Sequence, residues 1–250
     1  MEEIHLTAQT LFRLGPLPVT NSLIATWLGM LVLAGFGFVA TRRLRLVPTG
    51  FQNAAEAIIE ALLGLMTQVT QDRAKAERFF PFLATFFAFI LTANWLELLP
   101  GFGSLTYAGT PLLRSANTDL NTPLALALIS VIGTQIAGIA ALGFWRHAGH
   151  YLTFKPTLEG AIGTFVGLLH IIGEVARVLS FSFRLFGNIF AGEVLLVVIS
   201  YLVPYLIPLP FYIMELFVGL IQALVFTMLT LVFLTAATTD THQEEGAAHT

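Results

Sequence analysis

One apolar segment of this chain, residues 156–203, is longer than a lipid bilayer is thick. It is apolar throughout except for isolated polar side chains. As a straight helix, residues 157–198 would extend about 63 Å at about 1.5 Å per residue, whereas the hydrocarbon core of a bilayer is roughly 30 Å thick. We therefore expect this helix to tilt steeply, to lie partly along the membrane or to break.

The remaining segments predict further helices in the same membrane. Hydrophobic residues make up 56% of the 250 residues and charged residues only 11%, whereas a soluble domain carries about 25% charged residues. We predict an all-α integral membrane protein with one membrane domain over residues 1–250. The predicted elements are a spanning helix over residues 22–41, an amphipathic surface helix or subunit contact over 52–77, spanning helices over 79–98 and 121–145, a steeply inclined helical hairpin over 157–239 and a polar tail over 240–250.

The positive charges predict the direction in which the chain crosses the membrane. If the first helix runs from outside to inside, the outer side receives only Arg13 and Arg114. The inner side then receives Arg42, Arg43, Arg45, Arg73, Lys75, Arg78, Arg146 and Lys155. Because cytoplasmic loops carry an excess of Lys and Arg, we expect the N-terminus outside, five crossings and the C-terminus inside. The acidic first residues, MEEIHLTAQT, argue against a cleaved signal peptide.

Arg184 is the charge that most constrains the function. It lies inside the apolar run LSFSFRLFGNIF, residues 179–190, and the nearest acidic residues, Glu174 and Glu193, are more than two helical turns away. A guanidinium in the middle of a membrane costs roughly 2.5–3.5 kcal/mol on insertion scales. We expect something to meet this charge: a partner in the chain, water, or a charge on another subunit.

Other polar residues form stripes on the last two helices. A spacing of seven keeps residues on one helical face, because each heptad drifts by only about 20°. The first stripe comprises His170, Arg177, Arg184 and, one turn further, Asn188. The last helix carries Glu215 and Gln222 seven residues apart, and Glu193 faces roughly the opposite side of its own helix. Since intramembrane ionisable groups usually face a cavity or a bundle interior, two such stripes predict a wetted path.

Simpler structural roles stay open for some of these residues. Arg177 could pair with Glu174 three residues earlier, and His170 could be a hydrogen-bonded histidine of the core. Glu97, which closes the second span, is interpreted as a residue that reaches to the membrane interface. The chain contains no Cys, and the remaining histidines show no spacing that indicates a metal site: His147, His150, His242 and His249.

At these residues the chain resembles a known family. The segment SFRLFGNIFAGE, residues 182–193, resembles the signature of subunit a of the F-type ATP synthase membrane sector. Three other segments agree with that family in order: PVTNS at 18–22, SANTDLN at 115–121 and ELFVGLIQALVFTMLTLVFL at 215–234. The resemblance therefore covers essentially the whole chain, and it implies one upright N-terminal helix and a long inclined hairpin against a rotor ring.

The resemblance also implies roles for the polar residues. Arg184 would be the stator arginine that faces the carboxylate of the rotor ring. Proton translocation would further involve Glu193, Glu215, Gln222 and Asn188. His170, Arg177, Asp119 and Asn121 match positions on a possible proton path or structural polar positions. The family varies between His and acidic residues at the positions of Glu193 and Glu215, and here both are Glu, so we expect the two to share one proton.

The same resemblance implies the partners: the c-ring, the peripheral stalk subunit b and membrane lipid. It implies a bacterial inner membrane and two half-channels for protons, which the two glutamates favour over Na⁺. We expect no cofactor, no bound metal, no nucleic acid and no bound nucleotide, because the chain has no P-loop. The chain would then not be an enzyme on its own.

Two other classes of function, a transporter and a purely structural subunit, fit the sequence less well. A secondary ion-coupled membrane transporter would often show internal repeats with paired broken helices, yet the N-terminal half has no counterpart of SFRLFGNIFAGE. A purely structural membrane subunit would not need Arg184 and two intramembrane glutamates.

Overall fold

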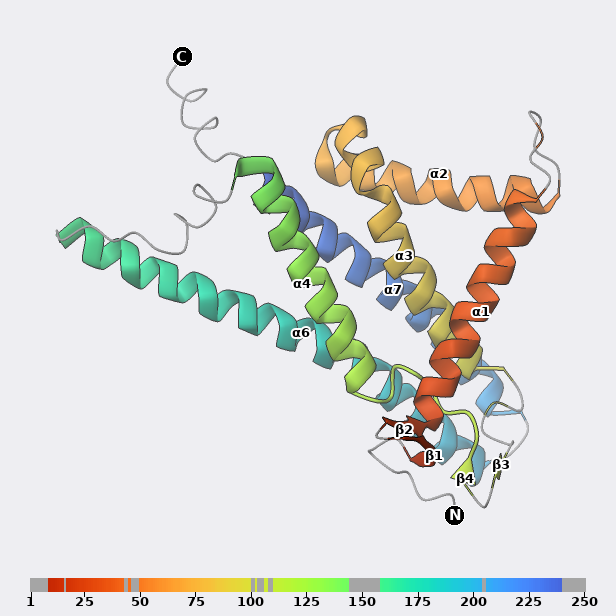
Figure 1. Ribbon diagram of the computed structural model, residues 1–250. Helices are drawn as coiled ribbons and strands as arrows, with labels where there is room; N and C mark the ends of the chain where they lie inside the picture. The colour runs from red at the N-terminus through yellow and green to blue at the C-terminus, as the bar shows by residue number, and fades with distance from the viewer. Residues whose placement is uncertain are drawn as a thin grey trace.

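The computed structural model describes residues 9–15, 17–42, 45, 50–99, 102, 106–107, 110–143, 158–203 and 206–239 (Figure 1). Its elements are β1 (Thr10–Leu14), β2 (Leu17–Thr20), α1 (Asn21–Thr41), α2 (Phe51–Thr70), α3 (Arg73–Glu97), β3 (Thr106–Tyr107), β4 (Thr110–Pro111), α4 (Asn121–Leu142), α6 (Leu158–Leu202) and α7 (Pro208–Thr238). Five of these helices are long and apolar enough to cross a membrane: α1, α3, α4, α6 and α7. The predicted all-α membrane fold is confirmed.

Helix α6 is a single unbroken helix. Its 45 residues correspond to about 68 Å at about 1.5 Å per residue. No proline occurs inside it, so no residue removes a backbone hydrogen bond or forces a kink. Figure 1 shows α6 steeply inclined to α4 and α1, with its N-terminal part extending beyond the other helices. The structure thus excludes a break in this segment and shows one helix inclined to its neighbours.

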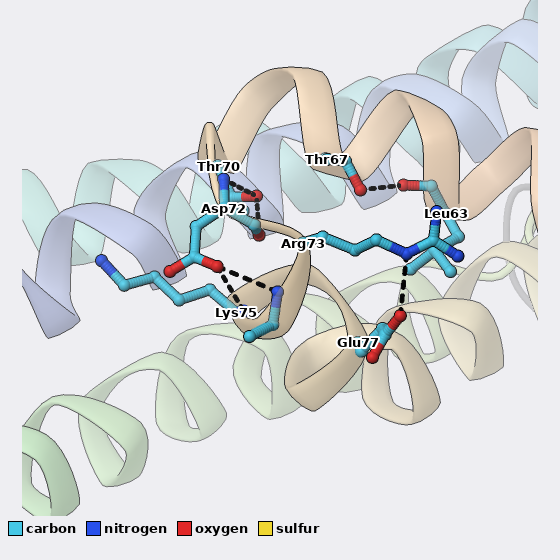
Figure 2. Close-up of polar contacts among 8 residues, drawn as sticks. Leu63, Thr67, Thr70, Asp72, Arg73, Lys75 and Glu77 are labelled. Carbon is cyan, nitrogen blue, oxygen red and sulfur yellow. Dashed lines mark hydrogen bonds and ion pairs between the residues drawn. The ribbon is translucent and has the colours of Figure 1, made fainter.

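The amphipathic helix that we predicted over residues 52–77 is shorter in the structure. Helix α2 ends at Thr70, where Gln71 adopts a left-handed conformation with φ of 54°. Asp72 then caps the next helix, since its side chain accepts hydrogen bonds from the backbone amides of Ala74 at 2.9 Å and Lys75 at 3.4 Å (Figure 2). The periodic pattern continues through this turn, so the pattern alone placed the boundary too late.

The turn between α2 and α3 is further held by Thr70. Its hydroxyl donates to the backbone oxygen of Asp72 at 2.8 Å, and Arg73 forms an ion pair with Glu77 at 2.9 Å (Figure 2). Helix α3 therefore begins at Arg73, earlier than the predicted span over 79–98. Helix α4 ends at Leu142, and the predicted polar tail over 240–250 lies outside the described residues.

Two short antiparallel hairpins, β1–β2 and β3–β4, gather at the end of the bundle where α1 and α4 begin (Figure 1). The sequence analysis predicted no strands here. Thr20, the last residue of β2, caps α1 by accepting a hydrogen bond from the amide of Leu23 at 3.3 Å. At the opposite end of the bundle, α2 lies across the direction of the spanning helices (Figure 1).

Phe226 on α7 marks the centre of the apolar core. Its ring centroid lies 5.5 Å from that of Phe86 on α3 and 5.0 Å from that of Phe181 on α6. Both neighbours are buried, and Leu185 and Ile90 belong to the same cluster. Because α3, α6 and α7 meet at these rings, the depth of the polar groups on α6 and α7 is fixed relative to one another.

Candidate functional site

Arg184 lies on an exposed face of α6. Its Nη2 donates one long hydrogen bond, to Ser180 Oγ at 3.4 Å, and its Cζ lies 6.0 Å from the centroid of the Phe181 ring. Among the described residues, no carboxylate forms an ion pair with it. The guanidinium is thus presented at the surface of the chain with its charge uncompensated.

Arg177, one heptad earlier on α6, has entirely different surroundings. Its Nη1 lies 2.9 Å from both carboxylate oxygens of Glu174, and its Cζ lies only 3.7 Å from the centroid of the Phe233 ring on α7. The side chains of this ion pair are 20% and 16% exposed. Of the two alternatives for Arg177, the geometry has the structural ion pair, with a cation–π contact added.

The amides of Asn188 and Gln222 join α6 to α7 one turn beyond Arg184. Asn188 Nδ2 donates to Gln222 Oε1 at 3.4 Å. Gln222 is buried, and its Nε2 has no hydrogen-bond partner among the described residues. The structure therefore brings together two of the polar residues that the sequence analysis singled out, and it leaves one amide donor free to bind another group.

Glu215 reaches across to the backbone of α6. It is buried, and its carboxyl group lies directly against Gly192, where any Cβ would overlap it. The following residue, Glu193, is partly buried on the same helix. Glycine at position 192 is what allows the carboxyl group of α7 to approach the backbone of α6 so closely. These carboxylates lie about 13 Å along α6 from Arg184, because nine residues at about 1.5 Å separate Glu193 from it.

Glu97, the last residue of α3, belongs to the same cluster of carboxylates. Its carboxyl group lies close enough to interact electrostatically with Glu193, Glu215 and Arg114, and it lies near Ser115 in the loop before α4. Glu97 is partly buried rather than exposed. The order of the helices could have found it: α3 ends and α7 begins at the same end of the bundle, which places Glu97 and Glu215 near each other (Figure 1).

Two asparagines that the sequence analysis did not single out, Asn94 and Asn117, connect α3 and α7 to the loop before α4. Asn117 Nδ2 donates to Asn94 Oδ1 at 2.7 Å, and Asn94 Nδ2 donates to the backbone oxygen of Gly219 at 3.0 Å. On the next residue of α3, Trp95 Nε1 donates to the backbone oxygen of Leu216 at 3.2 Å. Both asparagines are buried. They bind α3 and the loop to the first turns of α7, which carry Glu215.

Asp119 and Asn121 lie at the start of α4. Their hydrogen bonds are to α1 and to each other rather than to the carboxylate cluster. Asp119 Oδ2 accepts a hydrogen bond from Ser22 Oγ on α1 at 2.9 Å, and Asp119 Oδ1 accepts one from Asn121 Nδ2 at 2.9 Å. Asp119 is buried, whereas Asn121 is exposed. These residues connect the outer loop to the first helix.

His170 is exposed on α6. Along this helix it precedes Arg184, whereas Glu193 follows Arg184. The described residues contain no group of three His, Cys, Asp or Glu side chains that could hold a metal ion. The other histidines noted in the sequence, His147, His150, His242 and His249, lie outside the described residues.

A family model and several relatives match this chain over most of its length, and all of them are ATP synthase a subunits. The family described as ATP synthase A chain matches residues 23–235. The chain is 32% identical to ATP synthase subunit a of Moorella thermoacetica over 230 residues, covering 92% of this chain and 96% of the relative. It is 39% identical to ATP synthase subunit a of Gloeobacter violaceus over 238 residues, covering 94% and 89%. It is 33% identical to ATP synthase subunit a 2 of a Bradyrhizobium strain over 238 residues, covering 95% and 97%.

Proposed function

Since this chain belongs to the ATP synthase A chain family and is thus a multi-pass membrane subunit of the ATP synthase complex, we propose that it provides two half-channels that pass protons to and from a rotating c-ring. Arg184 faces the ring carboxylate. The chain makes no ATP itself; it is the static part against which the ring turns.

The single observation that carries this proposal is the exposed guanidinium of Arg184 on α6, which forms no ion pair with any carboxylate among the described residues. A charge in the membrane interior is retained only where something meets it. The other intramembrane arginine of α6, Arg177, meets Glu174 inside the chain. For Arg184 the missing anion lies on the surface that α6 presents to its partner, which is where a ring carboxylate would pass.

Arg184 would have two effects on proton movement. A cation close to a carboxylate favours its ionised form, so a protonated ring carboxylate that reaches Arg184 releases its proton into one half-channel. The same fixed charge repels a proton that could otherwise pass directly between the half-channels. Protons must then travel with the ring, driven by about 2.3 kcal/mol per charge for each 100 mV.

The polar groups on either side of Arg184 suggest how the half-channels divide. Glu97, Glu193 and Glu215 gather beside the outer loop, and we assign them to the outer half-channel as groups that share protons. Asn188, which is hydrogen-bonded to Gln222, lies between this cluster and Arg184 along α6. His170 lies on the opposite side of Arg184 and belongs to the inner half-channel.

The remaining surfaces suit the other partners of such a subunit. Helix α1 exposes large apolar side chains for lipid or for the peripheral stalk subunit b, including Trp27, Leu31 and Phe38. The Lys and Arg asymmetry supports an N-terminus outside and a C-terminus in the cytoplasm of a bacterium, in its inner membrane.

The proposal is tested by Arg184→Ala in the complete ATP synthase, with ATP-driven proton pumping measured in inverted membrane vesicles. We expect pumping to fall to background while the subunit still assembles, because the charge that ionises the ring carboxylate is gone. Passive proton leak should rise, since the barrier between the half-channels is removed. Arg73→Ala, which removes an exposed ion pair at the inner surface, is the matched control and should pump normally. Near-normal pumping by Arg184→Ala would refute the proposal.

A further inference from the structure

We propose that Ser22 and Asp119 form a latch that positions the outer loop over the proton path, and that Asp119 does not itself carry protons. This inference rests on the proposed function. The latch comprises the hydrogen bond from Ser22 on α1 to Asp119 in the loop before α4. It concerns an acidic residue that the resemblance left open between a proton path and a structural role.

The hydrogen bonds of Asp119 favour the structural role. Oδ2 accepts from Ser22 Oγ at 2.9 Å, and Oδ1 accepts from the backbone amide and from the side-chain Nδ2 of Asn121, at 3.3 and 2.9 Å. Both carboxylate oxygens are thus occupied by donors. Asn121 presents only N–H groups to Oδ1, so it can donate to that oxygen but cannot accept a proton from it. The carboxylate thereby holds the start of α1 and the start of α4 against each other.

The α1 side of the latch is anchored by its neighbours. Asn21 Nδ2 donates to the backbone oxygen of Pro111 at 3.4 Å, and Asn21 Oδ1 accepts from the amide of Gln9 at 3.2 Å. Ser22 is only 2% exposed and Asp119 8%. The beginning of α1, hairpin β1–β2 and the loop before α4 are therefore joined by buried polar contacts, which are costly to leave unmade.

The other side of the loop reaches the proposed outer half-channel. Two residues before Asp119, Asn117 donates to Asn94, and Asn94 donates to the backbone of Gly219 on α7. Ser115 of the same loop faces Glu97. The loop is held by α1 at Asp119 and by α3 at Asn117. Without the latch, the loop keeps only the longer contact from Asn21 to Pro111 with α1, and Ser115 and Asn117 are held less firmly beside the carboxylate cluster.

The isosteric variant Asp119→Asn separates the two roles. Its side chain keeps one oxygen and gains one amide donor, so it can bond both Asn121 and the Ser22 hydroxyl, yet it cannot take up or release a proton. We compare Asp119→Asn, Asp119→Ala, Ser22→Ala and the double variant Ser22→Ala with Asp119→Ala. Each is built into the complete ATP synthase, and ATP-driven proton pumping is measured per amount of subunit assembled with the ring.

We expect Asp119→Asn to pump at close to the rate of the unmodified complex. Asp119→Ala and Ser22→Ala should each lower pumping several-fold. The double variant should pump no worse than Asp119→Ala, because both changes remove the same hydrogen bond between Ser22 and Asp119. If Asp119→Ala fails to assemble, Asp119→Asn and Ser22→Ala still decide between the roles.

The latch is refuted if Asp119→Asn assembles but pumps as poorly as Arg184→Ala, because that result makes Asp119 a proton carrier. It is also refuted if Ser22→Ala pumps normally. These results differ from a failure of the proposed function, which would show as normal pumping by Arg184→Ala in the same vesicles.

Discussion

Arg184 and Arg177 lie one heptad apart on α6, yet only Arg177 has its charge compensated within the described part of the chain. The residue type and the helical face are shared, so neither accounts for the difference. What distinguishes them is their surroundings: Arg177 has Glu174 three residues earlier on α6 and the Phe233 ring of α7 over its guanidinium, whereas the Arg184 guanidinium is exposed. At the scale of single residues, function follows from which charges the fold leaves unmatched.

The three carboxylates of the outer cluster lead to a prediction at the same scale. We expect Glu193→Gln and Glu215→Gln each to slow proton flux in reconstituted vesicles. The loss in the double variant should be far from additive, because removing either carboxylate already interrupts a shared proton path. The position of Glu97 beside both of them predicts that Glu97→Gln also slows flux, contrary to its interpretation as an interface residue. Glu60→Gln on the exposed face of α2 is the control. Independent, additive losses would mean that these carboxylates are structural.

At the scale of elements, α6 and α7 contact each other at two places, one formed by a carboxyl group and the other by a guanidinium on an aromatic ring. At the outer place, Gly192 lets the carboxyl group of Glu215 approach the backbone of α6. At the inner place, Arg177 stacks on Phe233, and the Phe181 ring centroid lies 5.9 Å from that of Phe233. The exposed face with Arg184 lies between them, so these contacts set the direction in which Arg184 points.

The inner contact predicts the effect of Phe233→Leu. Leucine keeps most of the apolar packing but removes the ring face, so we expect a loss of about 0.5–2 kcal/mol in the free energy of unfolding. Unfolding of the purified subunit in mixed detergent micelles measures this loss. In combination with Arg177→Gln the two effects should be strongly coupled, whereas Phe217→Leu on the exposed face of α7 should cost little. Additive effects of Arg177→Gln and Phe233→Leu would show that the cation–π contact contributes nothing.

At the scale of the whole molecule, the two ends of the bundle differ in character. The end with the hairpins contains the amide network and the carboxylate cluster. The opposite end contains α2 and the charged turn of Asp72, Arg73 and Lys75 (Figures 1 and 2). The positive charges thus gather where the cytoplasm is expected.

This asymmetry predicts the labelling pattern of single cysteines, which is simple to measure because the chain has no Cys of its own. Cysteines introduced at residues 3 and 246 should react with a membrane-impermeant maleimide from opposite sides of the membrane. Arg13→Cys in β1 should label together with residue 3, and Glu60→Cys in α2 should label together with residue 246. Labelling of residues 3 and 246 from one side would exclude five crossings.

The sequence by itself determined the features that depend on chain length and on the chemistry of single residues. Apolar runs longer than the bilayer is thick required spanning helices and an inclined one, and the unmatched charge of Arg184 indicated where a partner must act. The signature around it identified the family before any contact was known.

Only the tertiary structure decided which polar groups meet. Glu97 and Glu215 are far apart in the chain and are neighbours because α3 ends where α7 begins. Asn94 carries no sequence signal, since isolated amides recur in any helix, and the segment SANTDLN around Asn117 does not reveal that Asn94 is its partner. The pairing of Arg177 with Phe233 depends on how two helices cross. Helical periodicity defines the face of each helix but not the register between helices, and that register is set by packing around Phe226 and by the space that Gly192 leaves for a carboxyl group.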